Sequence, residues 1–118
     1  MTDDPRLSLR LHFETGLTFG RGKADLLQGI DEEGSISGAG RRMGMSYRRA
    51  WSLVEDMNGH FAAALVDSSR GGAKGGGAAL TDLGRRVLAD YRALEELLRD
   101  QGSAQLQRLR AAQRYTQS

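Results

Sequence analysis

The segment that most constrains the fold is SYRRAWSLVEDM, residues 46–57. Its apolar residues recur at the spacing i, i+3, i+4 and i+7, which is typical of a helix with one buried face. They are Ala50, Leu53, Val54 and Met57. Ser46 is a favourable N-cap for this helix, and Gly44 is the small residue that a turn between two helices favours. The segment therefore predicts the recognition helix of a helix-turn-helix motif.

Two shorter helices are predicted before this turn. Apolar residues have helical spacing over residues 24–30, and the pattern ends at Gly34. The following segment, 35–43, is short and begins with Ser35 or Ser37, either of which can cap a helix. Its internal glycines make this helix weak by itself, so we expect packing to stabilise it.

Strands are predicted on both sides of the helices. Residues 7–13 (LSLRLHF) alternate between apolar and polar side chains without exception, which indicates a half-buried strand. Further short strands are expected near residues 65–67 and 78–80, on either side of a glycine-rich loop. Three helices followed by a hairpin predict a mainly α, α+β winged helix-turn-helix. We expect the leading strand to join this hairpin in one small sheet.

A long helix is predicted to begin after Thr81, a suitable N-cap. We expect residues 1–80 to form the DNA-binding domain and residues 81–118 to form a dimerisation helix and a weakly helical tail. The helix contains a seam at coiled-coil spacing. Its residues are Val87, Tyr91, Leu94 and Leu98, and Leu9 and Leu11 of the leading strand could add to a two-fold interface. Alternatively, the seam folds back on the first helix of its own chain.

Charge is sorted along the chain, although the net charge is only +2. Residues 34–54 contain four arginines and no acid, and residues 68–80 contain two more cations and no acid. This distribution predicts one basic face. Arginine suits bidentate contact with guanine, and hydroxyl groups reach phosphates. The candidate DNA-binding residues are Ser37, Arg41, Arg42, Ser46, Tyr47, Arg48, Arg49, Ser52, Arg70 and Lys74. Trp51 could lie in the core or face DNA.

Other classes of function find little support in the sequence. Lys74 follows an alanine and precedes a glycine, so the loop fails the phosphate-binding P-loop pattern. Neither histidine lies in a metal-binding or catalytic motif, and the chain has no cysteine. We therefore expect no enzyme activity, no metal and no cofactor. The acidic start and the absence of a long apolar run predict a cytoplasmic protein without membrane association. The alternative function is a protein-interaction winged helix, with Tyr47 and Trp51 as anchors.

Two segments resemble a known family. GSISGAGRRMGMSYRRAWSLVEDMN (34–58) and LVDSSRGGAKGGGAALTDLGRRVLADY (65–91) are similar to the N-terminal winged-helix domain of the molybdate-responsive ModE regulators. That domain is itself similar to the DNA-binding domain of LysR-type regulators. The resemblance spans Lys23 to Leu98. It implies a bacterial or archaeal transcription regulator that dimerises through its N-terminal strand and its long C-terminal helix.

In the full regulators, paired oxyanion-binding domains that sense molybdate follow this domain. Here residues 99–118 follow the region of resemblance. We therefore expect a short form that does not bind molybdate tightly. It would act constitutively, respond through the helix dimer, or work with a separate effector-binding protein.

Overall fold

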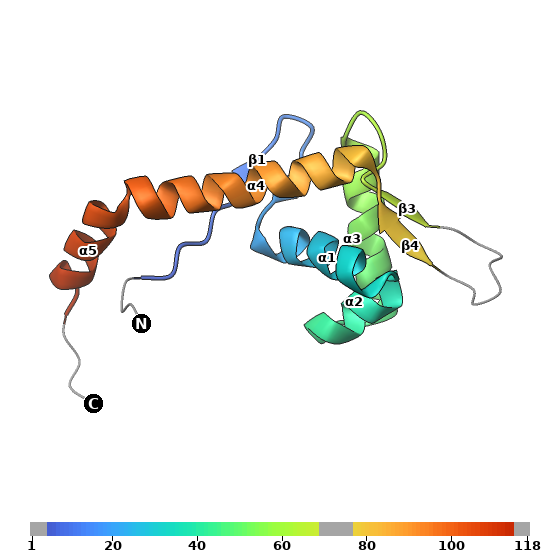
Figure 1. Cartoon of the computed structure of the whole chain (residues 1–118), viewed down its shortest axis with the longest axis horizontal. Coiled ribbons are helices and arrows are strands. Elements are labelled where there is room, and N and C mark those ends of the chain that lie inside the picture. Colours follow the sequence, from blue (N-terminus) through green and yellow to red (C-terminus); the bar gives the residue numbers. More distant parts are fainter. Residues whose placement is uncertain (1–4, 69–76, 115–118) are drawn as a thin grey trace.

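Three helices form the centre of the fold in the computed structural model, which describes residues 5–68 and 77–114 (Figure 1). They are α1 (Arg21–Glu33), α2 (Ile36–Met43) and α3 (Tyr47–His60). The hairpin β3 (Val66–Ser68) and β4 (Ala78–Leu80) follows. The chain then enters α4 (Asp82–Gln101) and α5 (Ser103–Ala112). This order confirms the predicted mainly α, α+β winged-helix architecture.

Helices α2 and α3 begin where the sequence predicted, whereas α1 begins earlier, at Arg21. The Ser35 hydroxyl accepts a 2.9 Å hydrogen bond from the Gly38 amide at the start of α2. The Ser46 hydroxyl accepts a 3.1 Å bond from the Arg49 amide at the start of α3. These bonds satisfy amide groups that have no partner within the first turn of a helix. Of the two candidate caps for α2, Ser35 is therefore the one used.

The core lies between α1, α2, α3 and the wing hairpin. Ala50, Val54 and Met57 are buried on one face of α3, as the periodicity predicted, and Leu53 is half-buried. They pack with buried apolar residues of α1, α2, β3 and the position just before β3, namely Leu26, Leu27, Ile30, Ala39, Leu65 and Val66. The shared core fixes the position of α3 relative to the hairpin.

Helix α3 extends to His60, three residues beyond the segment 46–57 whose periodicity predicted it. Near its end, the Asn58 side chain bonds to the backbone at the start of β3. Its Oδ1 accepts hydrogen bonds from the amides of Leu65 (2.8 Å) and Val66 (3.2 Å), and its Nδ2 donates to the Val66 carbonyl (3.1 Å). Asn58 thus links α3 directly to β3.

The leading strand differs from the prediction. Only Leu11–His12 forms a strand, β1, and it pairs with β2 (Thr18–Phe19). This is a separate two-stranded sheet, so the expectation that the leading strand joins β3–β4 was wrong. Residues 7–10 keep the predicted alternation of half-buried and exposed side chains, but they are not part of a strand. The prediction failed because the partner strand is two residues long and lies within a segment that resembled a turn.

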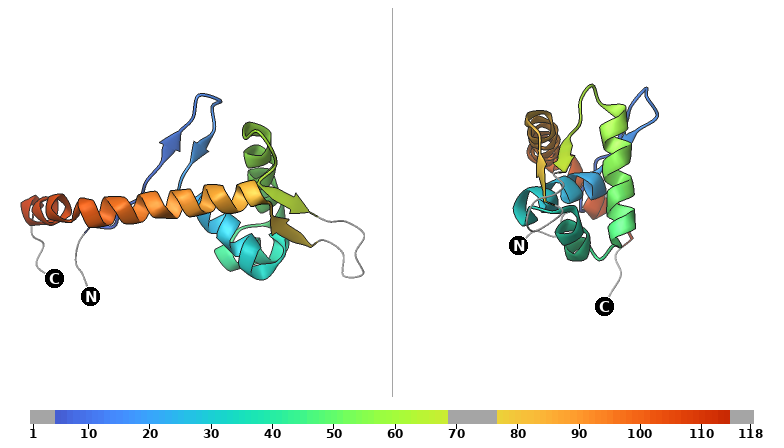
Figure 2. Two further views of the ribbon diagram at one scale, coloured as in Figure 1. Left: turned by 45° about the horizontal axis from the view of Figure 1, so that its top comes forward. Right: turned by 90° about the vertical axis from the view of Figure 1, so that its right-hand side faces the viewer.

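Helix α4 begins against the hairpin and then extends away from the three central helices (Figure 2). The Thr81 hydroxyl accepts a 3.0 Å bond from the Gly84 amide and donates a 2.7 Å bond to the Ala64 carbonyl. A side chain at Gly84 would overlap the Leu65 carbonyl, so glycine permits this close approach. No helix in the described ranges is both long and apolar enough to cross a membrane.

Candidate nucleic-acid interface

The turn between α2 and α3 is short and hydrogen-bonded. Gly44 has φ +72°, a left-handed conformation that favours glycine, and its amide donates to the Arg41 carbonyl at 3.1 Å. The Met45 amide donates to the Gly40 carbonyl at 2.9 Å. These contacts hold the first turn of α3 at the surface of the domain.

The exposed side of α3 carries the predicted polar residues. Tyr47 is 56% exposed, and Arg48, Arg49 and Ser52 are also exposed. The side chains of these arginines have no ion-pair partner among the described residues. Trp51 is half-buried and packs against the core, in agreement with the first of its two interpretations. The available groups on this face of α3 are therefore guanidinium and hydroxyl groups.

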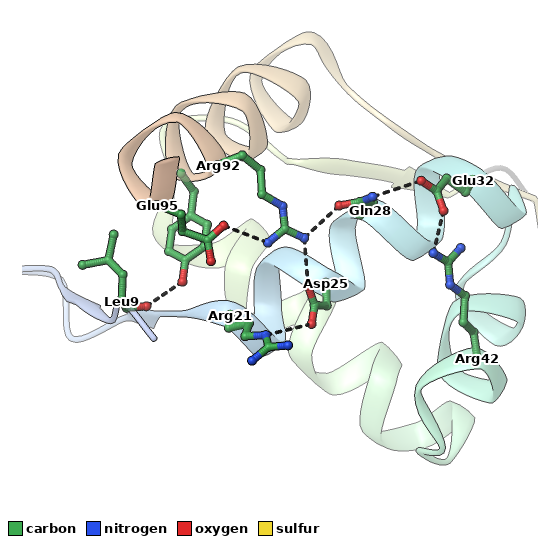
Figure 3. A network of polar contacts seen from close by, with 9 residues as sticks. Leu9, Arg21, Asp25, Gln28, Glu32, Arg42, Arg92 and Glu95 are labelled. Carbon is green, nitrogen blue, oxygen red and sulfur yellow. Dashed lines mark hydrogen bonds and ion pairs between the residues drawn. The ribbon is translucent and has the colours of Figure 1, made fainter. Parts of the chain in front are cut away.

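Helix α2 presents its polar residues in two different ways. Ser37 is half-buried in the first turn, and Arg41 is exposed without an ion-pair partner in the part of the chain described. Arg42, in contrast, lies against α1 (Figure 3). Its Nη2 is 2.6 Å from Glu32 Oε1, and its Nη1 is 3.5 Å from Glu33 Oε2. Hydrogen bonds from Gln28 and Arg42 lower the pKa of Glu32, so the acid stays ionised in this pair.

A cavity of about 340 Å³ flanks α3 on the side of the N-terminal segment. Four cations line it and no acid does; they are Arg10, Arg21, Lys23 and Arg49. Of these four cations, only Arg49 was predicted from the sequence, because Arg10 is an isolated cation in a strand pattern and the others precede the expected first helix. The predicted wing cations, Arg70 and Lys74, lie outside the described residues.

The predicted seam of α4 divides into two parts. Tyr91 is only 2% exposed, and its ring contacts that of Phe19 edge-on at 5.3 Å between centroids. Its hydroxyl donates a 2.6 Å bond to the Leu9 carbonyl, and burial followed by the nearby Glu95 charge raises the pKa of the Tyr91 phenol. Val87 is half-buried against the same core. These two residues therefore fold back on their own chain, as the alternative interpretation expected.

The distal part of the seam lacks such cover. Leu94 and Leu98 are about two-fifths exposed, and the neighbouring Leu97 is 54% exposed. Leu9 and Leu11, the other predicted interface residues, are half-buried and pack against the core. The described apolar surface of α4 thus lies at its distal half and includes Leu97, which the heptad spacing did not select.

The sequence is similar to several bacterial proteins whose names refer to molybdenum or to transcription regulation. No family model matches the chain. It is 43% identical over 94 residues to the molybdenum-pterin-binding protein MopB of Rhodobacter capsulatus, and 40% identical over 87 residues to the molybdenum transport protein ModE of Azotobacter vinelandii. These alignments cover 79% and 74% of this chain but only 35% and 32% of the relatives. The chain thus spans about a third of the length of the curated relatives it matches. The DNA-binding transcriptional dual regulator ModE of Escherichia coli is 37% identical over 75 residues.

Solved structures agree with the fold. The CbnR DNA-binding domain, determined as a complex with DNA, matches with a TM-score of 0.58 at 24% identity and covers 79% of this chain and 97% of that one. The LysR-type regulator LysG of Corynebacterium glutamicum matches with a TM-score of 0.52 at 26% identity, over 72% of this chain and 27% of that one. The chain is therefore a homologue of the ModE and MopB proteins over most of its own length, with the winged-helix fold of LysR-type DNA-binding domains.

Proposed function

We propose that this chain is a sequence-specific DNA-binding transcription regulator that works as a homodimer. The observation that carries the proposal is the exposed face of α3, where Arg48 and Arg49 have no ion-pair partner in the described structure and stand opposite a buried apolar stripe. An unpaired arginine pair on a capped helix after a tight turn is suited to an anionic partner. The names of the relatives support the same class of function.

In this proposal α3 enters the major groove. Arg48 points away from the buried stripe and donates to the O6 and N7 atoms of a guanine, since its planar fork matches both acceptors. The hydroxyl groups of Tyr47, Ser46 and Ser52 bind phosphates beside the groove. Trp51 contributes through packing, because it is half-buried against the core.

Phosphate contacts extend over neighbouring elements. Ser37 and Arg41 of α2 face one DNA strand, and Arg70 and Lys74 of the wing remain predicted contacts. Arg49 acts together with Arg10 at the basic cavity beside α3, whereas Lys23 in the same cavity is paired with Asp56, with 3.6 Å between Nζ and Oδ2. Arg42 was also predicted to bind DNA, but its two ion pairs with α1 support a role in positioning α2.

The distal half of α4 supports the proposed two-fold dimer. Leu94, Leu97 and Leu98 form an exposed apolar surface that a second copy of α4 would cover. Two winged-helix domains on such a dimer would bind half-sites about one helical turn apart, roughly 34–36 Å. The molybdenum in the names of the relatives belongs to those proteins. Our expectation for this chain, no tight molybdate binding, can be tested by calorimetry with molybdate and tungstate.

DNA selected from a random pool tests the function. We expect enrichment of a palindromic sequence, and fluorescence anisotropy should show binding that weakens steeply with salt because phosphate contacts release counterions. No enrichment and no binding at low salt would contradict the proposal. A protein partner that binds through exposed Tyr47 and persists at high salt, without any DNA binding, would instead favour the protein-interaction alternative.

A further inference from the structure

One arginine connects α4 to α1 near the point where α4 leaves its own domain. Arg92 Nη2 donates to Asp25 Oδ1 and to Gln28 Oε1, each at 2.8 Å, and Arg92 Nη1 donates to Glu95 Oε1 at 3.1 Å (Figure 3). We call these four residues the Arg92 cluster. Glu95 is only 6% exposed, so its carboxylate depends on this partner. A planar guanidinium can satisfy three acceptors at once in a fixed orientation.

The cluster continues toward the helix-turn-helix. Gln28 Nε2 donates to Glu32 Oε2 at 3.1 Å, and Glu32 Oε1 accepts from Arg42 of α2 at 2.6 Å. Figure 3 shows this path running from α4 over α1 to α2. The orientation of α4 is therefore tied by directional contacts to the helices that present α3.

The position of the cluster along α4 gives it mechanical importance. The start of α4 is held against the backbone of Ala64 and Leu65. Tyr91 and the cluster provide its last attachments to the domain in the described part of the chain, since residues 96–101 are all exposed. The apolar surface proposed for dimerisation begins at this point. Anything that changes the angle of α4 at the cluster changes the distance between the two domains of a dimer.

The geometry makes that distance sensitive to small angles. Helix α4 has 20 residues, which corresponds to about 30 Å at 1.5 Å per residue. A tilt of about 10° around its first turn would move its far end by roughly 5 Å. One base-pair step is about 3.4 Å, so a tilt of this size exceeds the step between neighbouring half-site spacings.

We infer that Arg92 is a specificity-determining residue that acts through position. The Arg92 cluster fixes the angle between α4 and the winged-helix domain, and this angle sets the half-site spacing that the dimer accepts. The inference rests on the proposed function, because spacing has meaning only for a dimer that binds DNA. Arg92 itself touches no base in this account.

The test replaces Arg92 by lysine. Arg92→Lys keeps the charge beside buried Glu95, but one ammonium group lacks the planar fork needed to hold Asp25, Gln28 and Glu95 together. The matched control is Arg85→Lys, on the same helix, where the 3.7 Å contact with Asp82 stays within α4 and is exposed. Binding is measured on a single half-site and on palindromes whose spacer is shortened or lengthened by one or two base pairs.

We expect the wild type and Arg85→Lys to prefer one spacing by roughly tenfold over its neighbours. Arg92→Lys should reduce that preference to about threefold or less while its single half-site affinity stays within about twofold, since α3 is unchanged. Unchanged half-site affinity also shows that the variant is folded.

A spacing profile for Arg92→Lys that matches the wild type would overturn the inference, as would a wild type that accepts every spacing equally. Both outcomes leave DNA binding intact, and so they differ from failure of the proposed function. If the proposed function itself fails, the wild type binds no DNA, and the inference about Arg92 fails together with the proposed function.

Discussion

Asn58→Ala tests how α3 is tied to the wing. The change removes three hydrogen bonds of 2.8, 3.1 and 3.2 Å between the Asn58 side chain and the backbone of Leu65 and Val66. Leu65 and Val66 are buried, at 0% and 3% exposure, so their amides lose partners in a site with little water. A buried amide left without a partner costs about 1–3 kcal/mol. Because Asn58 is itself half-buried, water can replace part of this loss, and we expect the free energy of unfolding to fall by about 2–4 kcal/mol.

Urea and thermal unfolding followed by circular dichroism measure this effect. For a domain of this size, the expected loss corresponds to a drop in Tm of roughly 8–16 °C. Asn58→Asp should be intermediate, because a carboxylate keeps the acceptor for the two amides but loses the donor to the Val66 carbonyl. Glu55→Ala is the control on the exposed side of α3 and should change stability by less than about 0.5 kcal/mol. If Asn58→Ala has the same free energy of unfolding as the Glu55→Ala control, the hydrogen bonds between α3 and β3 contribute nothing to stability and our reasoning is refuted.

Three further predictions concern the turn, the dimer and the basic cavity. Gly44→Val should destabilise the fold by about 1–3 kcal/mol because φ is +72° there, and unchanged urea unfolding would contradict this. Leu94→Glu should convert a dimer into a monomer in light scattering at tens of micromolar, because the new charge opposes apolar contact; a monomeric wild type would refute the dimer. Arg10→Ala should reduce the slope of log affinity against log salt by about 1 and lower the affinity for all DNA sequences equally. A slope equal to that of the control variant Arg85→Ala would show that Arg10 does not contact DNA.

The helices could be predicted because their signals are local. Ser46 and Thr81 are caps whose partners lie three residues away, and the buried stripe of α3 follows from its own spacing. The short strands of the wing were also expected close to their observed positions. Such features require no knowledge of distant segments, since each depends on neighbours within one helical turn or one strand.

The features that were missed depend on contacts between distant segments. The spacing of Tyr91 is that of a coiled coil, but no periodicity shows that Phe19 and Leu9 cover it. The alternation of residues 7–13 gave the correct inward side chains at Leu7, Leu9 and Leu11 but not at Phe13, which is exposed. The partner strand is determined by the tertiary fold.

The same limit applies to the candidate site. Arg42 belongs to a basic run and was grouped with the DNA-binding arginines, yet Glu32 and Glu33 of α1 lie beside it in space. The cations Arg10 and Lys23 approach Arg49 only after the N-terminal segment and α1 pack beside α3. Charge runs in a sequence therefore identify a basic segment, and the fold decides which of its members remain available to a ligand.

The central claim is that α3 recognises a specific DNA sequence. The most direct test is the affinity of Arg48→Ala for the DNA that the wild type selects. The measurement uses the palindrome selected by the wild type and a set of single base-pair substitutions in each half-site. We predict that Arg48→Ala binds the selected palindrome roughly 5- to 100-fold more weakly and no longer distinguishes guanine from other bases at one position per half-site. A variant that keeps the affinity and the base preference of the wild type at every position would contradict the account.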